Sequence, residues 1–132
     1  MADILHGLET NPDWRVTLEV EPVSFDFLKK QEPDTFYRLK AVLEADYDDP
    51  RAEIASGSYA QPFAWAIGGE SNIRHLLRGM TLVHDSFPGA VVDTYAVQEP
   101  CWTSALPQIL VSLGFKRAVL KNSTCWCGYT AG

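Results

Sequence analysis

The chain has 132 residues, and its 11 Lys and Arg against 17 Asp and Glu give a formal charge of -6 at pH 7. This acidity argues against nucleic acid and anionic membranes as partners, because cationic side chains dominate binding to both. No apolar run reaches the roughly 20 residues of a membrane span, and the N-terminus lacks the pattern of a signal peptide. With 46% hydrophobic residues, the sequence predicts one globular, cytoplasmic domain over residues 1–132.

The cysteines also favour a reducing compartment. Cys101, Cys125 and Cys127 form an odd set without the repeated spacing of a disulfide framework. Cys125 and Cys127 are too close together for the usual zinc knuckle, and no His lies near them in the sequence. We interpret them as buried or incidental thiols, with metal or redox function as the alternative.

The first half of the chain alternates strand and helix patterns. Apolar and polar residues alternate from Trp14 to Val20 with the period of a strand. Pro22 and Ser24, and then Pro33-Asp34, are typical helix starts. The expected elements are therefore a strand over 14–20, a helix over 22–30, a helix from 33 to the 46–50 cluster, a short strand over 51–56 and a loop to Gly69.

The second half continues the alternation. Apolar residues recur every three or four positions from residue 70, which predicts the clearest helix of the chain, ended by Pro88-Gly89. Gly79 within it costs about 1 kcal/mol relative to Ala, so we expect a close helix-to-strand contact there. Glu70 complements the positive end of the helix dipole, with direct sugar contact as the alternative. A strand over 90–97, a loop over 98–103, a helix over 104–113 capped by Gly114, and a strand over 115–120 complete the series.

These elements predict an α/β fold. Strands separated by helices pair in parallel through right-handed crossovers. About four parallel strands are too few to close a barrel, so we expect a partial β/α barrel with open sheet edges. Such edges could pair in a homo-oligomer.

Three segments of the sequence, in this order along the chain, contain recognisable motifs. They are Gly57-Ser58-Tyr59-Ala60-Gln61-Pro62, Gly69-Glu70-Ser71-Asn72-Ile73-Arg74-His75-Leu76-Leu77-Arg78-Gly79, and Ser104-Ala105-Leu106-Pro107-Gln108-Ile109-Leu110 followed by Gly114-Phe115. Together, from about Trp14 to about Cys127, they resemble the N-terminal catalytic domain of the family 38 glycoside hydrolases, the α-mannosidases. The resemblance implies a seven-stranded barrel in intact relatives, of which this chain would be a fragment.

The resemblance also implies retaining hydrolysis of α-mannosides with a zinc ion. Retention requires two carboxyl groups about 5 to 5.5 Å apart. The family's zinc-binding His-x-His-x-Asp is absent, and we expect His6, His75 and His84 to be surface or packing residues. Zinc is therefore expected in intact relatives, and no metal or other cofactor is expected for this chain alone.

The implied site departs from the family at the nucleophile. Aligned on Leu106-Pro107-Gln108, the nucleophile falls at Gln98, an amide that cannot attack a sugar. The neighbouring Glu99 could replace it or could be a solvated loop carboxylate.

Aromatic residues complete the implied site. Phe63 stands where the family often has an acidic residue. Tyr59, Trp65 and Trp102 are candidates for sugar stacking, although core packing is the common role of such side chains.

Two functional hypotheses follow. In the first, the chain is a fragment of an α-mannosidase-like glycoside hydrolase and is inactive alone. In the second, it is a non-catalytic carbohydrate-binding or scaffold protein derived from the same fold. The second hypothesis predicts sugar binding without hydrolysis of an aryl mannoside, and measurable turnover by the pure protein would rule it out.

Overall fold

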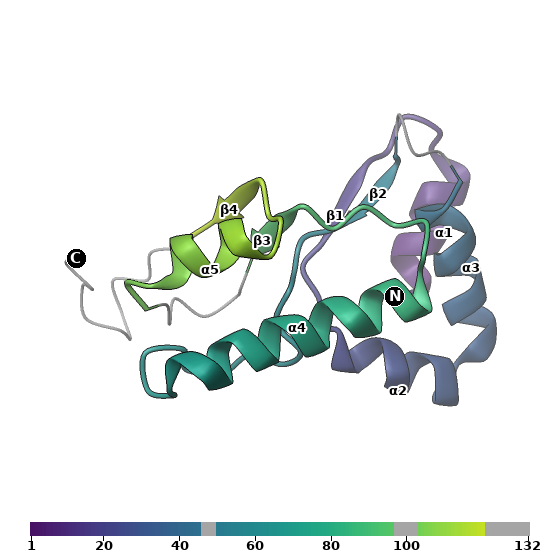
Figure 1. Ribbon diagram of the computed structural model, residues 1–132. Coiled ribbons are helices and arrows are strands. Elements are labelled where there is room, and N and C mark those ends of the chain that lie inside the picture. The colour runs from purple at the N-terminus through teal and green to yellow at the C-terminus, as the bar shows by residue number, and fades with distance from the viewer. Residues whose placement is uncertain (46–49, 97–102, 121–132) are drawn as a thin grey trace, which may run out of the picture.

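The computed structural model describes residues 1–45, 50–96 and 103–120 (Figure 1). The helices and strands predicted from the sequence occur in the expected order, with shorter strands than predicted and with a helix at the N-terminus. The elements are α1 (Ala2–Thr10), β1 (Val16–Leu18), α2 (Val23–Gln31), α3 (Pro33–Leu43), β2 (Ala52–Ile54), α4 (Gly69–Ser86), β3 (Thr94–Ala96), α5 (Leu106–Ser112) and β4 (Arg117–Val119).

The four strands form two parallel pairs. β1 pairs with β2, with Val16 opposite Ala52 and Leu18 opposite Ile54. β3 pairs with β4, with Thr94 opposite Arg117. Helices α2 and α3 lie between β1 and β2 along the chain, and α5 lies between β3 and β4, which provides the long connection that parallel pairing requires.

The predicted partial barrel is wrong. Within the described ranges the strands form two separate two-stranded sheets, β1-β2 and β3-β4, and no barrel closes. Each strand has only three residues, so each ladder contains few hydrogen bonds. Beyond β2 the backbone turns away to α4, where the Tyr59 N–H donates to the His75 carbonyl at 3.0 Å. The chain that would extend β2 toward β3 is thereby used in a helix contact.

Helix α4, the long helix labelled in Figure 1, contributes side chains to two hydrophobic cores. Leu82 and Val83 join the larger core, where the Phe87 ring lies 4.9 Å from that of Phe25 and 5.1 Å from that of Phe36. Leu76, near the middle of the helix, joins the smaller core with Tyr95 and residues of α5. Burial of such side chains contributes about 1.5 to 3 kcal/mol each. Helix α4 therefore stabilises the packing of both strand pairs.

Local signals at the helix ends are confirmed. Pro33 and Pro107 lie in the first turns of α3 and α5, where the missing N–H removes no helical hydrogen bond. Gly114 has a φ of 88° just beyond α5, a conformation that glycine adopts without a Cβ penalty. None of the helices in the described ranges combines the length and apolarity that a membrane crossing requires.

The β3-β4 pair is further joined by an ionic contact. The Asp93 carboxylate accepts from Arg117 at 2.5 Å and lies 3.3 Å from the Lys116 ammonium. Burial by itself raises the pKa of the Asp93 carboxyl, but the hydrogen bond to Lys116 and the charge of Arg117 outweigh it and lower the pKa. Burial of the neighbouring Tyr95 raises the pKa of its phenol to about 12.

Candidate functional site

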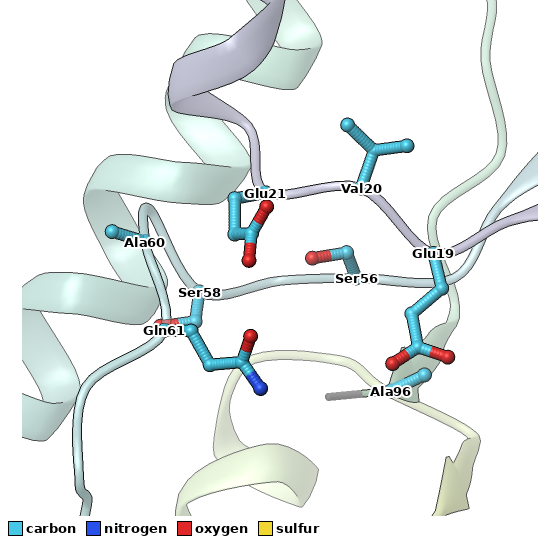
Figure 2. A pocket seen from close by; sticks show the side chains of 8 residues that line it. All are labelled: Glu19, Val20, Glu21, Ser56, Ser58, Ala60, Gln61 and Ala96. Atoms are coloured by element: carbon cyan, nitrogen blue, oxygen red, sulfur yellow. The ribbon is translucent and has the colours of Figure 1, made fainter. Parts of the chain in front are cut away.

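A polar pocket lies where the carboxyl ends of β1, β2 and β3 come together (Figure 2). In parallel α/β proteins this end of the strands is the usual place for ligands, because the loops that follow the strands meet there. The described residues that line the pocket are Glu19, Val20, Glu21, Ser56, Ser58, Ala60, Gln61 and Ala96.

Two carboxylates come from the segment that follows β1. The strand ends at Leu18, and Glu19 and Glu21 follow at alternate positions before α2 begins. Residues two apart on an extended chain point to the same side. Figure 2 shows the Glu21 carboxylate and the Gln61 amide directed toward the same central space, with Glu19 on the side of Ala96. The pocket therefore contains two acidic groups on one wall.

Two serine hydroxyls come from the segment that follows β2. Ser56 and Ser58 are each only 5% exposed, and Figure 2 shows the Ser56 hydroxyl directed into the space beside Glu21. A hydroxyl both donates and accepts hydrogen bonds, so both side chains are of a kind that suits contact with a polar ligand.

The pocket is small. Its free space is about 10 Å³, about what one water molecule needs. It therefore admits one hydroxyl-sized group of a ligand, and the rest of the ligand would lie outside it. This geometry suits a molecule recognised through individual polar substituents.

Helix α4 fixes the loop that carries the serines. A Cβ added to Gly79 would lie 2.6 Å from the Tyr59 nitrogen and would also collide with the Gly57 carbonyl oxygen. Gly79 therefore makes a close contact as predicted, but its partner is the loop backbone that follows β2 and not a strand. On the other side, the Val23 N–H donates to the Tyr59 carbonyl at 3.0 Å, which links the loop to α2.

Two of the aromatic residues predicted to bind sugar, Tyr59 and Trp65, lie in the described part of the chain, and they are not gathered in the pocket. Tyr59 is half-buried, with its ring 6.3 Å from that of His75 and 5.8 Å from the Arg78 guanidinium carbon. Trp65 is 62% exposed, and its ring lies 6.4 Å from that of Phe63. Neither Tyr59 nor Trp65 lines the pocket. Tyr59 thus has a packing role, whereas the Trp65 ring is accessible to a ligand at the surface.

The remaining predicted site residues, Gln98, Glu99 and Trp102, lie outside the described ranges. The chain reaches them from Ala96, the last residue of β3 and part of the pocket wall. The role of Glu99 as nucleophile therefore stays a prediction.

Sequence analysis missed the acidic residues and the serine before the loop. Glu19 was placed in the predicted strand over 14–20 and Ser56 in the one over 51–56, and Glu21 fell between the predicted strand and the helix over 22–30. One pattern in the sequence could have found them. Polar residues follow directly after a predicted parallel strand, which is where such folds bind ligands. The loop predicted to be functional does contribute Ser58 and Gln61 to the pocket.

The described residues do not fit the zinc ion that the mannosidase resemblance implies. No group of three or more His, Cys, Asp or Glu among them is placed to hold a metal ion. His6 and His84 are exposed, and His75 packs beside Tyr59. We therefore derive no chemistry through a metal from these residues.

Comparison with known proteins gives no family assignment. No protein-family model matches the chain, and no curated protein matches it significantly. Function must therefore be inferred from the pocket and from the motif resemblance.

Proposed function

We propose that the protein is an α-mannosidase-like glycoside-binding unit that recognises a mannoside through the polar pocket. The observation that carries this proposal is the convergence of Glu21, Ser56 and Gln61 on one hydroxyl-sized space at the carboxyl ends of the strands. The motif resemblance to the family 38 glycoside hydrolases supplies the sugar class.

The chemistry of the pocket suits a sugar hydroxyl. A hydroxyl both donates and accepts, and the pocket offers carboxylate oxygens as acceptors and serine and amide groups that do both. Hydrogen bonds to charged groups contribute about 1.5 to 3 kcal/mol each. Two or three such bonds would give binding in the range of weak carbohydrate recognition, about millimolar.

The same geometry argues for binding without hydrolysis. Glu19 and Glu21 lie on one extended segment, with Cα atoms about 6.6 Å apart at the usual rise per residue. Retaining hydrolysis needs two carboxyl groups that flank the scissile bond, whereas these two approach a ligand from one wall. They are suited to hold hydroxyls rather than to serve as acid and nucleophile.

Isothermal titration calorimetry with methyl α-D-mannoside tests this proposal. We expect the wild-type chain to bind and Glu21→Gln to bind at least about tenfold more weakly, a loss of about 1.4 kcal/mol. Glu70→Gln is the matched control, because Glu70 is an exposed carboxylate on α4 paired with Arg74.

Two results would contradict the proposal. One is absence of mannoside binding by folded protein, and the other is equal weakening by Glu21→Gln and by Glu70→Gln. An assay with an aryl α-mannoside, with and without added zinc, is expected to show no turnover. Measurable turnover by the pure chain would contradict binding without hydrolysis.

A further inference from the structure

A buried side chain of α4 is hydrogen-bonded to the loop that precedes this helix. Asn72 is only 6% exposed. Its amide nitrogen donates to the Ala64 carbonyl at 2.8 Å and to the Ile67 carbonyl at 3.4 Å. Burial of an amide is costly unless it is hydrogen-bonded, and an asparagine amide has two N–H donors. Asn72 therefore uses its amide nitrogen to bind the backbone of one loop at two places.

The loop that Asn72 binds is the segment that contributes Gln61 to the polar pocket. On one side of Gln61, the Tyr59 N–H donates to the His75 carbonyl at 3.0 Å. On the other side, the Ala64 carbonyl accepts from the Asn72 amide. His75 and Asn72 both belong to α4. The span that contains Gln61 is therefore attached to one helix on both sides.

The burial pattern of the loop agrees with this attachment. Ala64 is buried, whereas the side chains of Phe63 and Trp65 on either side of it are exposed. The Ala66 N–H donates to the Phe63 carbonyl at 2.8 Å, a hydrogen bond that closes a turn around Ala64. Asn72 therefore holds the buried residue of a turn whose two aromatic side chains are exposed.

We propose that Asn72 is a positioning residue of the polar pocket, because its two hydrogen bonds fix the loop that directs the Gln61 amide into the pocket (Figure 2). This inference rests on the proposed function for the role of Gln61 in sugar binding. A binding group that is already held in place loses less conformational freedom when a ligand binds. Loss of the Asn72 amide therefore weakens binding without removing a group that lines the pocket.

Nitrogen-15 relaxation of isotope-labelled protein and calorimetry with methyl α-D-mannoside test this role in the variant Asn72→Ala. Backbone order parameters are about 0.85 where the chain is rigid and below about 0.6 where it is flexible. We expect the amides of Gln61, Trp65 and Ala66 to be rigid in the wild type and to fall below about 0.6 in the variant. The affinity for the mannoside should fall at least about fivefold, because binding must then order the loop.

Further variants separate a local role from a general loss of stability. Asn72→Gln keeps both N–H donors on a longer side chain, and it should recover a large part of the loop order and of the affinity. Val83→Ala makes a cavity in the larger core on the same helix and lowers stability, but it should leave both properties unchanged. Thermal unfolding confirms that each variant is folded. Should Asn72→Ala fail to fold, Asn72→Ser, which keeps one donor, replaces it in the comparison.

Each result supports or overturns the inference. A flexible loop and weaker binding in Asn72→Ala, with both properties intact in Val83→Ala, support it. Wild-type order parameters in Asn72→Ala, an equal loss in Val83→Ala, or a flexible loop with unchanged affinity overturn it. If the folded wild type does not bind methyl α-D-mannoside, the proposed function is overturned, and the order parameters still decide whether Asn72 positions the loop.

Discussion

Gly79 of α4 lies against the backbone nitrogen of Tyr59, so closely that an added Cβ would be 2.6 Å from it. This contact holds the segment with Ser56 and Ser58 against the helix. A methyl group added at residue 79 would therefore displace the loop that lines the pocket.

Gly79→Ala should destabilise the protein and weaken mannoside binding. Overpacking costs about 1 to 3 kcal/mol, which exceeds the gain of about 1 kcal/mol that Ala contributes in a helix interior. Urea unfolding and calorimetry measure the two effects. Gly69→Ala is the control, because a Cβ there meets nothing within 4 Å, and it should keep both properties. If Gly79→Ala matched this control, the close contact would not constrain the loop.

The ionic contact between Asp93 and Arg117 predicts a pH dependence of stability. The pKa of Asp93 is lowered in the folded state. The stabilisation of the fold by the ionised carboxylate is therefore fully present above the unfolded pKa of about 3.9. It is lost as the pH falls through the lower, folded value.

Asp93→Asn should therefore cost about 1 kcal/mol at pH 7, a modest figure because Arg117 and Lys116 are largely exposed. Urea unfolding of wild type and variant from pH 7 to pH 2 provides the measurement. Their difference should shrink below about pH 4. A difference that stays constant with pH would show that the lost interaction is not ionic.

The raised pKa of Tyr95 leads us to expect a second pH dependence of stability, at alkaline pH. Its pKa is raised to about 12 by burial, so the folded state retains the proton when the unfolded chain has lost it, above about pH 10. Stability should be unaffected below about pH 10 and should fall as the pH rises toward the folded value. Tyr95→Phe should remove this part of the fall. An identical alkaline profile in the variant would assign it to other groups.

Two aromatic substitutions separate a packing residue from a surface residue. Tyr59→Ala should lower stability by about 2 to 4 kcal/mol, because the half-buried ring packs against His75 and the larger core. Trp65→Ala should change stability by no more than about 0.5 kcal/mol, because the ring is 62% exposed. Thermal unfolding measures both. Comparable losses would mean that the Trp65 ring is packed rather than accessible.

Local features of the fold could be predicted from the sequence because their causes are local. Pro33, Pro107 and Gly114 restrict the backbone at their own positions, and the apolar period of α4 reflects one buried face. Gly79 was predictable for a similar reason, since glycine inside a helix is unfavourable without a close neighbour.

The arrangement of the strands could not be predicted in this way. Parallel pairing followed from the alternation of helices and strands, but whether β2 joins β3 depends on where the chain goes after Ile54. After Ile54 the chain reaches α4, where the Tyr59 N–H donates to the His75 carbonyl, and nothing in the sequence near β2 indicates this contact. The expected barrel came from counting strands without knowing which ones meet.

The same reason explains the incomplete prediction of the site. Glu19, Ser56 and Ala96 are far apart in the sequence, and only the packing of both strand pairs on α4 brings them to one pocket. The polar residues at strand ends were a usable signal. Trp65 was a misleading signal for the position of the pocket. An aromatic residue in a predicted loop does not indicate which part of the surface it lies on.

Amide chemical shifts of isotope-labelled protein titrated with methyl α-D-mannoside test the central claim most directly. If the polar pocket binds the sugar, the saturable shifts will concentrate at Glu19 to Glu21 and Ser56 to Gln61, and Glu21→Gln will suppress them. Saturable shifts centred elsewhere, for example around Phe63 and Trp65 alone, or no shifts in folded protein, would contradict it.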